Sequence, residues 1–146
     1  MGLMPLPPGR DVLLDTNIIV YSVEKVIEYW PTLVPLWASA KRHEVRLVAS
    51  EVVIPELLAK PLRVKNYRLV AQYRAVLQPR SLTLYPITQH ILQRAAYLRA
   101  EFGLKTPDAI IASTAVEHEA LLLTNDKKLA AIDDAETIYL EEAAAS

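Results

Sequence analysis

Five short runs of mostly apolar residues recur along the chain, separated by longer segments with helical spacing. The runs are residues 12–15, 46–50, 81–88, 121–126 and 136–140. Consecutive apolar residues without polar alternation are typical of strands buried on both faces of a parallel sheet, although the run at 81–88 alternates weakly. We therefore predict five strands.

The segments between these strands carry signals for helix starts and stops. We expect helices over 18–24, 32–43, 61–77, 89–103, 106–120 and 127–132. Ser50 is a candidate N-cap for one further helix, although Pro55 disfavours helical geometry in the residue before it. Pro61 suits the first turn of the helix at 61–77, Thr106 is a candidate N-cap, and Gly103 ends the helix before it.

Strands that alternate with helices indicate right-handed crossovers and a parallel sheet covered by helices on both faces. Apart from a short acidic and alanine-rich tail, the chain contains no repeat or low-complexity segment. We expect a single α/β domain over residues 1–146, with an ordered core over about 11–140. Ligands of open α/β sheets bind outside the carboxyl ends of the strands, so functional residues are expected there.

The composition excludes several classes of enzyme. Three glycines, Gly2, Gly9 and Gly103, cannot supply the loops of P-loop NTPases or dinucleotide-binding dehydrogenases, nor the nucleophile elbow of hydrolases. The chain has no cysteine, so oxygen or histidine ligands must hold any metal. No apolar run approaches the roughly 18 residues of a membrane span, and we expect a soluble, cytoplasmic protein.

The formal net charge of the chain is only -1, but its charges are unevenly distributed. No Asp or Glu occurs between residues 57 and 100, whereas this segment carries eight Lys and Arg residues. Such a run is often only the solvated face of a helix. The alternative is a cationic surface that attracts a polyanion.

Four carboxylates occupy positions that the predicted fold brings together. Asp15 ends the first strand and Asp126 follows the fourth, while Glu56 and Asp108 lie near the starts of two helices. They are too far apart in sequence for local ion pairing and can meet only through the fold. Converging carboxylates repel one another unless a cation lies among them, and Mg²⁺ or Mn²⁺ prefers such oxygen ligands.

Each of these acids also has a purely structural alternative. Asp15 begins an Asp-Thr-Asn sequence that suits a turn or a cap, Asp108 complements its helix dipole, and Asp126 can cap the helix at 127–132. The three histidines have no partner at metal-site spacing. We expect the histidines to be structural or surface residues, and the tyrosines and tryptophans to lie in the core or in interfaces.

Several segments together resemble a known family, the PIN-domain nucleases, and within it the VapC-type toxins of toxin–antitoxin pairs. They are "LLDTNIIVY" at 13–21, "SEVVIPELL" at 50–58, "LYPITQHILQRAAYLRAEFG" at 84–103, "KTPDAIIASTA" at 105–115 and "LLLTND" at 121–126. Each motif alone is weak. Their shared order and the fitting length of the chain make the resemblance fairly specific.

This resemblance implies a three-layer α/β/α sandwich and a metal-dependent endoribonuclease whose products carry 5′-phosphate and 3′-hydroxyl ends. It assigns catalytic and metal-binding roles to four acids and supporting roles to two polar residues. The acids are Asp15, Glu56, Asp108 and Asp126, and the polar residues are Asn17 and Thr124. Pro55, directly before Glu56, departs from the family pattern. The implied cofactor is Mg²⁺ or Mn²⁺, and the implied partners are RNA, an antitoxin and a second copy in a homodimer.

The resemblance thus implies the toxin of a type II toxin–antitoxin pair, which hydrolyses RNA phosphodiester bonds. We expect Arg63, Lys65 and Arg68 to lie near Glu56 and to contact the RNA backbone. One alternative is a PIN scaffold that binds RNA or protein without cutting. Another is a flavodoxin-like phosphoryl-transfer protein, which is weakened because position 17 is Asn17 rather than a second acid.

Overall fold

The computed structural model describes residues 2–145, so Met1 and Ser146, the ends of the expected domain, lie outside the described residues. A five-stranded sheet forms the centre, in the order β3-β2-β1-β4-β5, with every neighbouring pair parallel. The strands are β1 (Asp11–Leu14), β2 (Arg46–Ser50), β3 (Thr83–Tyr85), β4 (Leu121–Thr124) and β5 (Thr137–Tyr139). The predicted α/β fold with a parallel sheet of about five strands is confirmed.

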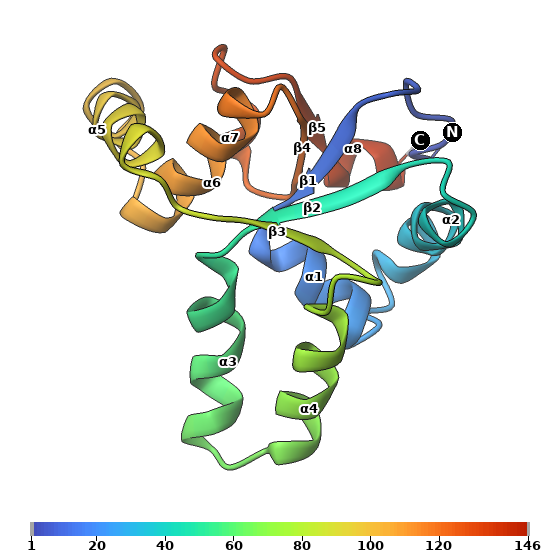
Figure 1. Ribbon diagram of the computed structural model, residues 1–146. Helices are drawn as coiled ribbons and strands as arrows, with labels where there is room; N and C mark the ends of the chain where they lie inside the picture. Colours follow the sequence, from blue (N-terminus) through green and yellow to red (C-terminus); the bar gives the residue numbers. More distant parts are fainter. Residues whose placement is uncertain (1, 146) are drawn as a thin grey trace.

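Helices cover both faces of the sheet and complete the predicted three layers (Figure 1). On one side lie α1 (Thr16–Val23), α2 (Trp30–Lys41), α3 (Val53–Arg63) and α4 (Tyr67–Val76). On the other side lie α5 (Gln89–Phe102), α6 (Thr106–Glu117) and α7 (Lys127–Ala130), while α8 (Leu140–Ala145) follows β5. The hairpin of α3 and α4 projects away from the body of the molecule (Figure 1).

The apolar core surrounds the two central strands. Leu13 and Leu14 of β1 and Leu122 of β4 are completely buried, as expected for strands with a helical layer on each face. Helix α6 also belongs to this core, because every residue from Ala109 to Ala115 is buried. No helix among residues 2–145 is long and apolar enough to cross a lipid bilayer.

The strand order reverses its direction between β1 and β4, which makes this pair the switch point of the sheet. From β1 the chain proceeds through β2 to β3, then returns past its starting point to β4 and β5. Strands β1 and β4 are therefore direct neighbours, with Leu14 opposite Leu123, although their outgoing connections lie on opposite faces. In open α/β sheets, ligands bind at the carboxyl ends of two such strands.

The start of α3 differs from the prediction and clarifies the position of Glu56. Ser50 is not the N-cap, because α3 begins at Val53 after Val52, and the Ser50 hydroxyl accepts a hydrogen bond from the Val52 N–H at 3.1 Å. Pro55 is the third residue of the helix, where its missing N–H has no helical partner to lose. Pro55 therefore leaves Glu56 in the regular first turn. Likewise, α6 begins at Thr106 itself, which is not an N-cap.

The prediction of one helix over 61–77 is wrong. Pro61 lies inside α3, which ends at Arg63, and a short turn separates it from α4. Lys65 in this turn has a φ of 59°, which breaks the helical path. The Asn66 side chain then caps α4 by accepting a hydrogen bond from the Leu69 N–H at 3.2 Å.

Within residues 2–145, four helices end with a non-glycine residue in the left-handed conformation. These residues are Lys25, His43, Lys65 and Glu119, with φ between 51° and 60°. Each lies in a Schellman motif, in which the following N–H returns to a carbonyl in the last turn; Glu44 donates to Ser39 in this way at 3.0 Å. The chain thus uses side-chain-bearing residues where glycine is normally favoured.

Replacing His43 by Gly is expected to stabilise the protein by about 0.5 kcal/mol, because glycine removes the steric cost of the left-handed conformation but loses more entropy on folding. His43 is exposed, so the replacement removes no core packing. Urea unfolding of wild type, His43→Gly and His43→Ala measures the effect. His43→Ala keeps the steric cost and should show no gain; equal stability of the two variants would contradict this explanation.

Candidate active site

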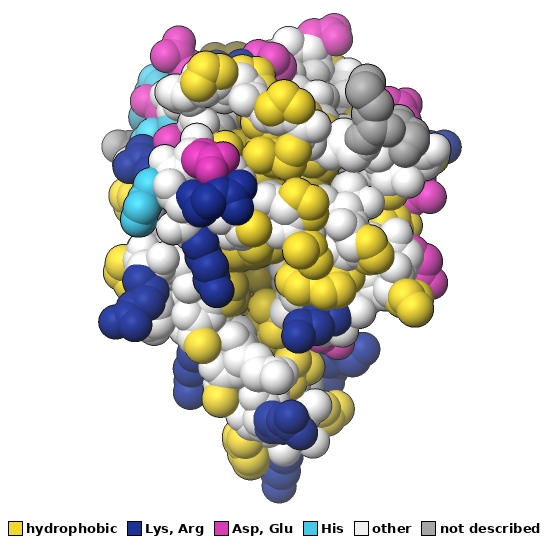
Figure 2. Space-filling view, turned by 90° about the vertical axis from the view of Figure 1, so that its right-hand side faces the viewer, with side chains coloured by type: hydrophobic (Ala, Val, Ile, Leu, Met, Phe, Trp, Pro, Cys, Tyr) yellow, Lys and Arg dark blue, Asp and Glu magenta, His cyan; other side chains and the backbone are white. Residues whose placement is uncertain are grey.

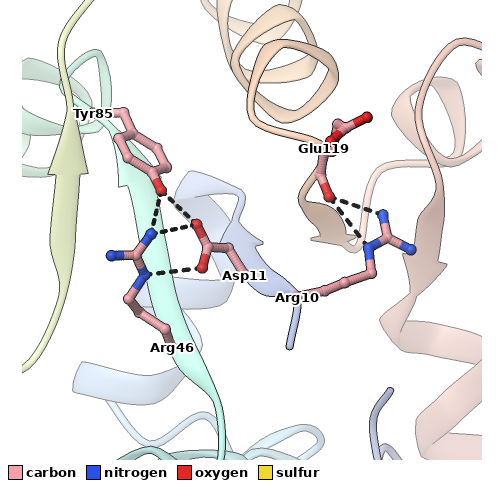
Figure 3. Close-up of polar contacts among 5 residues, drawn as sticks. All are labelled: Arg10, Asp11, Arg46, Tyr85 and Glu119. Atoms are coloured by element: carbon pink, nitrogen blue, oxygen red, sulfur yellow. Dashed lines mark hydrogen bonds and ion pairs between the residues drawn. The ribbon is translucent and has the colours of Figure 1, made fainter. Parts of the chain in front are cut away.

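The charged side chains at the amino-terminal edge of the sheet are paired with one another (Figure 3). Arg46 donates hydrogen bonds of 2.9 and 2.8 Å to Asp11, and Tyr85 donates to the same carboxylate. Arg10 donates to the backbone carbonyl of Glu119. The hydrogen bond from Arg46 holds the pKa of Asp11 below its usual value. A cavity of about 810 Å³ opens at this edge, but the pairing gives these charges a structural role.

Asp15 lies at the opposite edge, directly after β1 and beside the end of β4. It caps α1, because Oδ1 accepts a hydrogen bond from the Thr16 N–H at 2.8 Å, and Oδ2 accepts one from Thr124 Oγ1 at 2.7 Å. Only 4% of its surface is exposed. Burial raises the pKa of Asp15 to about 6; the two hydrogen bonds oppose this shift, and the charges of Asp108 and Asp126 add to it.

Glu56 reaches the start of α1 from the first turn of α3. Its Oε1 accepts a hydrogen bond of 2.6 Å from Thr16 Oγ1. Thr16 therefore connects two of the predicted acids, since its N–H binds Asp15 and its hydroxyl binds Glu56. Glu56 itself is exposed, which leaves it accessible to a ligand.

Asp126 is held directly after β4 by two backbone contacts. Its N–H donates to Thr124 Oγ1 at 3.0 Å, and its Oδ1 accepts from the Lys128 N–H at 2.8 Å, which makes it the N-cap of α7. The Thr124 hydroxyl consequently joins Asp126 to Asp15. Asp15 and Asp126 therefore also have the helix-capping roles that were their structural alternatives, because Asp15 caps α1 and Asp126 caps α7.

Asp108 completes the group from the first turn of α6. Burial raises its pKa, and the charges of Asp126 and Glu56 raise it further, whereas Lys105 and Lys128 oppose the shift. The pKa of Asp108 thus depends on the charges of Asp126 and Glu56. The pKa of Asp15 in turn depends on the charge of Asp108. The four predicted acids therefore share one electrostatic environment at the carboxyl edge.

The arrangement of these carboxylates is open rather than tightly convergent. Among residues 2–145, no group of three or more acidic or histidine side chains lies closely enough together to hold a metal ion by itself. Hydrogen bonds to Thr16 and Thr124 fix Asp15 and Glu56 where they are. The donor chemistry nevertheless fits a hard divalent ion, which binds few carboxylates and completes its coordination with water and substrate phosphate.

The structure also gives the positions of the other predicted site residues, whose roles stay predictions. The side chain of Asn17 is exposed on α1 and makes no hydrogen bond within residues 2–145. Arg63 lies seven residues beyond Glu56 on α3, about 10 Å along the helix axis, and Lys65 and Arg68 follow it. These three cations thus lie toward the end of α3 that is remote from the sheet, and their predicted contact with the RNA backbone stays a prediction.

Three residues near the acids were missed by sequence reasoning. Thr16 binds Asp15 and Glu56, while Lys105 and Lys128 place positive charge near Asp108. Both lysines lie within three residues of a predicted acid in the sequence, which was an available signal. Thr16 has the same signal, because it follows Asp15 directly, but its contact with Glu56 could not be predicted because Glu56 lies 40 residues away.

Without metal, Asp15→Asn is expected to be more stable than wild type by about 3 kcal/mol at about pH 8, because no buried charge remains. The amide can keep both contacts, since the Thr124 hydroxyl can accept instead of donate. The folded-state pKa of Asp15 lies above its unfolded value of 3.8, so wild type loses stability as pH rises from about 4 to about 6.

Urea unfolding in a chelator, at about pH 4 and about pH 8, measures this difference. The two proteins should converge at the lower pH, where Asp15 is protonated in the folded state. A variant that is no more stable than wild type at the higher pH would show that the charge of Asp15 is already compensated.

The PIN domain family model matches residues 12–135 of this chain. A comparison with curated protein sequences finds no match. Among solved structures, the chain is similar to a toxin–antitoxin complex from Klebsiella pneumoniae, with 26% sequence identity and a TM-score of 0.68. That match covers 89% of this chain and 98% of the other.

Two further solved structures share the fold at lower sequence identity. VapBC2 from Rickettsia felis, bound to a DNA fragment from its promoter, is 22% identical with a TM-score of 0.71, covering 88% of this chain and 97% of that chain. DNA-bound VapBC from Salmonella typhimurium is 16% identical with a TM-score of 0.70, covering 90% and 98%.

Proposed function

The chain belongs to the PIN domain family, whose members are generally nucleases, and we propose that it is a metal-dependent endoribonuclease. One observation carries this proposal. Four acids from separate segments lie near the carboxyl ends of β1 and β4 and influence one another's pKa. Asp15 among them is buried, and it has no ion pair with a cation within residues 2–145. Acids at the amino-terminal edge, such as Asp11, are instead neutralised by arginine.

The residues that would hold a divalent ion are Asp15 and Asp108, with Glu56 and Asp126 as further ligands or as supports. PIN nucleases generally use divalent metal ions. When bound, Mg²⁺ or Mn²⁺ supplies positive charge that offsets the phosphodiester anion and favours its hydrolysis by water. The carboxylates themselves would repel the RNA, so the proposed activity requires such a cation.

Residues next to the four acids would orient them and attract the substrate. Thr124 and the Thr16 N–H hold the two oxygens of Asp15, and the Thr16 hydroxyl holds Glu56. Lys105 and Lys128 provide positive charge next to Asp108, where a phosphate must approach. Hydrolysis adds water across one P–O bond, leaving a 5′-phosphate on one product and a 3′-hydroxyl on the other.

A metal titration of RNA cleavage tests this proposal. Purified protein, stripped with a chelator, should be inactive, and Mg²⁺ or Mn²⁺ should restore cleavage to products with 5′-phosphate ends. If the stripped protein binds RNA and no divalent ion restores cleavage, the proposal is wrong. The chain would then be a non-cutting RNA-binding scaffold.

We further propose that the chain is the toxin of a toxin–antitoxin pair. The support is the similarity to the toxin–antitoxin complex from Klebsiella pneumoniae, which extends over 98% of that chain. An antitoxin would then be a partner of this protein, and it would inhibit RNA cleavage when bound.

We also predict a homodimer. Apolar side chains are visible over much of one face of the molecule (Figure 2), and Val34 on α2 is 42% exposed while the nearby Ile27 is 82% exposed. Burying such surface against a second copy would stabilise a dimer. Sedimentation at tens of micromolar should show the dimer mass, and Val34→Glu should dissociate it. A wild-type monomer at this rough concentration would contradict the prediction.

A further inference from the structure

The turn between α3 and α4, with the helix ends beside it, forms an exposed tip. We define the hairpin tip as residues 62–68. Tyr67 within it is 62% exposed, and its side chain makes no hydrogen bond or ring contact within the described part of the chain. Tyr67 therefore presents an aromatic surface to solvent, unlike Tyr73 on the same helix, which is buried and bonded to Glu24.

The hairpin tip is strongly cationic. Arg63, Lys65 and Arg68 are exposed, and none forms an ion pair with another residue among 2–145. No acid lies between residues 57 and 100 to neutralise them. The turn between α3 and α4 is the lowest part of the molecule in Figure 1. The same region in Figure 2 shows Lys and Arg among hydrophobic side chains, and no acid.

The hairpin tip is separate from the candidate active site. Helix α3 begins beside the acids and leads directly to the tip, so Arg63 lies about 10 Å along the axis from Glu56. A strand whose scissile phosphate lies among the acids must therefore extend along α3 to reach Tyr67. The two places can contact different nucleotides of the same strand.

We propose that the hairpin tip is a second contact site for single-stranded RNA, in which Tyr67 stacks on one base and Arg63, Lys65 and Arg68 bind the adjoining phosphates. An exposed aromatic ring among unpaired cations is the combination that binds single strands without reading their sequence. A second copy of this chain is a poor occupant, because two such tips would repel each other. The inference rests on the proposed nuclease function, since it places the same substrate.

The test compares affinities for a single-stranded RNA of about 12 nucleotides by fluorescence anisotropy, in a chelator so that no cleavage occurs. Tyr67→Ala should weaken binding about tenfold, the fold-change expected when one base no longer stacks. Tyr67→Phe keeps the ring and should bind like wild type. The matched control is Tyr97→Ala, because Tyr97 is 76% exposed on α5, away from the tip, and should have no effect.

A duplex of the same sequence provides a second measurement. Its bases are already stacked, so Tyr67→Ala should change duplex affinity much less than single-strand affinity. Unchanged single-strand affinity of Tyr67→Ala would overturn the inference, as would an equal loss for Tyr97→Ala or for the duplex. The inference would also be overturned if Tyr67→Ala changed the sedimentation mass but left RNA affinity unchanged. That result would show that the hairpin tip contacts a second copy of the chain.

Cleavage by the wild type separates this inference from the proposed function. If wild type cuts the same RNA with metal but Tyr67→Ala binds it normally, only the inference fails. If Tyr67→Ala loses affinity about tenfold but wild type never cuts with any divalent ion, only the nuclease proposal fails.

Discussion

Asp108→Asn is expected to cleave RNA at least about a hundredfold more slowly than wild type at saturating Mg²⁺ or Mn²⁺, because a bound metal contributes several kcal/mol to catalysis. Asp108 is half-buried among other acids, so its replacement removes repulsion and leaves the fold intact. Asp15→Asn should have the same effect on cleavage. Initial rates on a labelled RNA, with circular dichroism to verify folding, measure the result.

A matched control for this change is Asp133→Asn. Asp133 is exposed in the segment after α7, it is no member of the acidic group, and its replacement removes the same charge from the chain. Asp133→Asn should cleave like wild type. Wild-type cleavage by Asp108→Asn would show that the metal site has been assigned to the wrong residues.

The second large effect is expected from replacing Arg63, Lys65 and Arg68 together by Ala. Removing one phosphate interaction with a single strand lowers the slope of log affinity against log salt by about 0.7, so removing three lowers it by about 2. Binding should weaken most at low salt and equally for all RNA sequences, because interactions with phosphates do not read bases. A salt series with Asp108→Asn protein measures the slope without cleavage.

The matched control replaces Lys25, Lys41 and Arg80 by Ala. These cations are also exposed, and Lys25 shares with Lys65 the left-handed conformation at a helix end, with a φ of 51°. Removing them changes the net charge by the same amount at other places on the surface. Equal slopes for the two triple variants would show that RNA responds to total charge, and that the hairpin is no specific contact.

The main architecture could be predicted from sequence because it depends on patterns that local residues carry. The runs at 12–15 and 121–126 each begin with three consecutive apolar residues, which indicates central strands, and the alternation with helices favours a parallel order. The break in the predicted helix over 61–77 could not be predicted in this way. It depends on Lys65 adopting a left-handed conformation that its residue type does not favour.

The same contrast applies to the candidate site. The four acids could be identified because each stands at a strand end or a helix start. The direction of α3 is not encoded in any spacing, so the sequence could not show that this helix leads from Glu56 away from the sheet toward Arg63. The raised pKa of Asp15 likewise depends on burial by residues from several segments, which only the packed structure provides.

The adjacency of β1 and β4 has a consequence for how the protein is made. The hydrogen bond between Asp15 and Thr124 joins residues 109 positions apart, and Asp126 follows two residues later. During synthesis, β1 leaves the ribosome long before its central partner exists, and such non-local pairing forms late in folding. A growing chain that has not reached Asp126 lacks part of the acidic group. The cell therefore encounters the proposed nuclease activity only in nearly finished molecules.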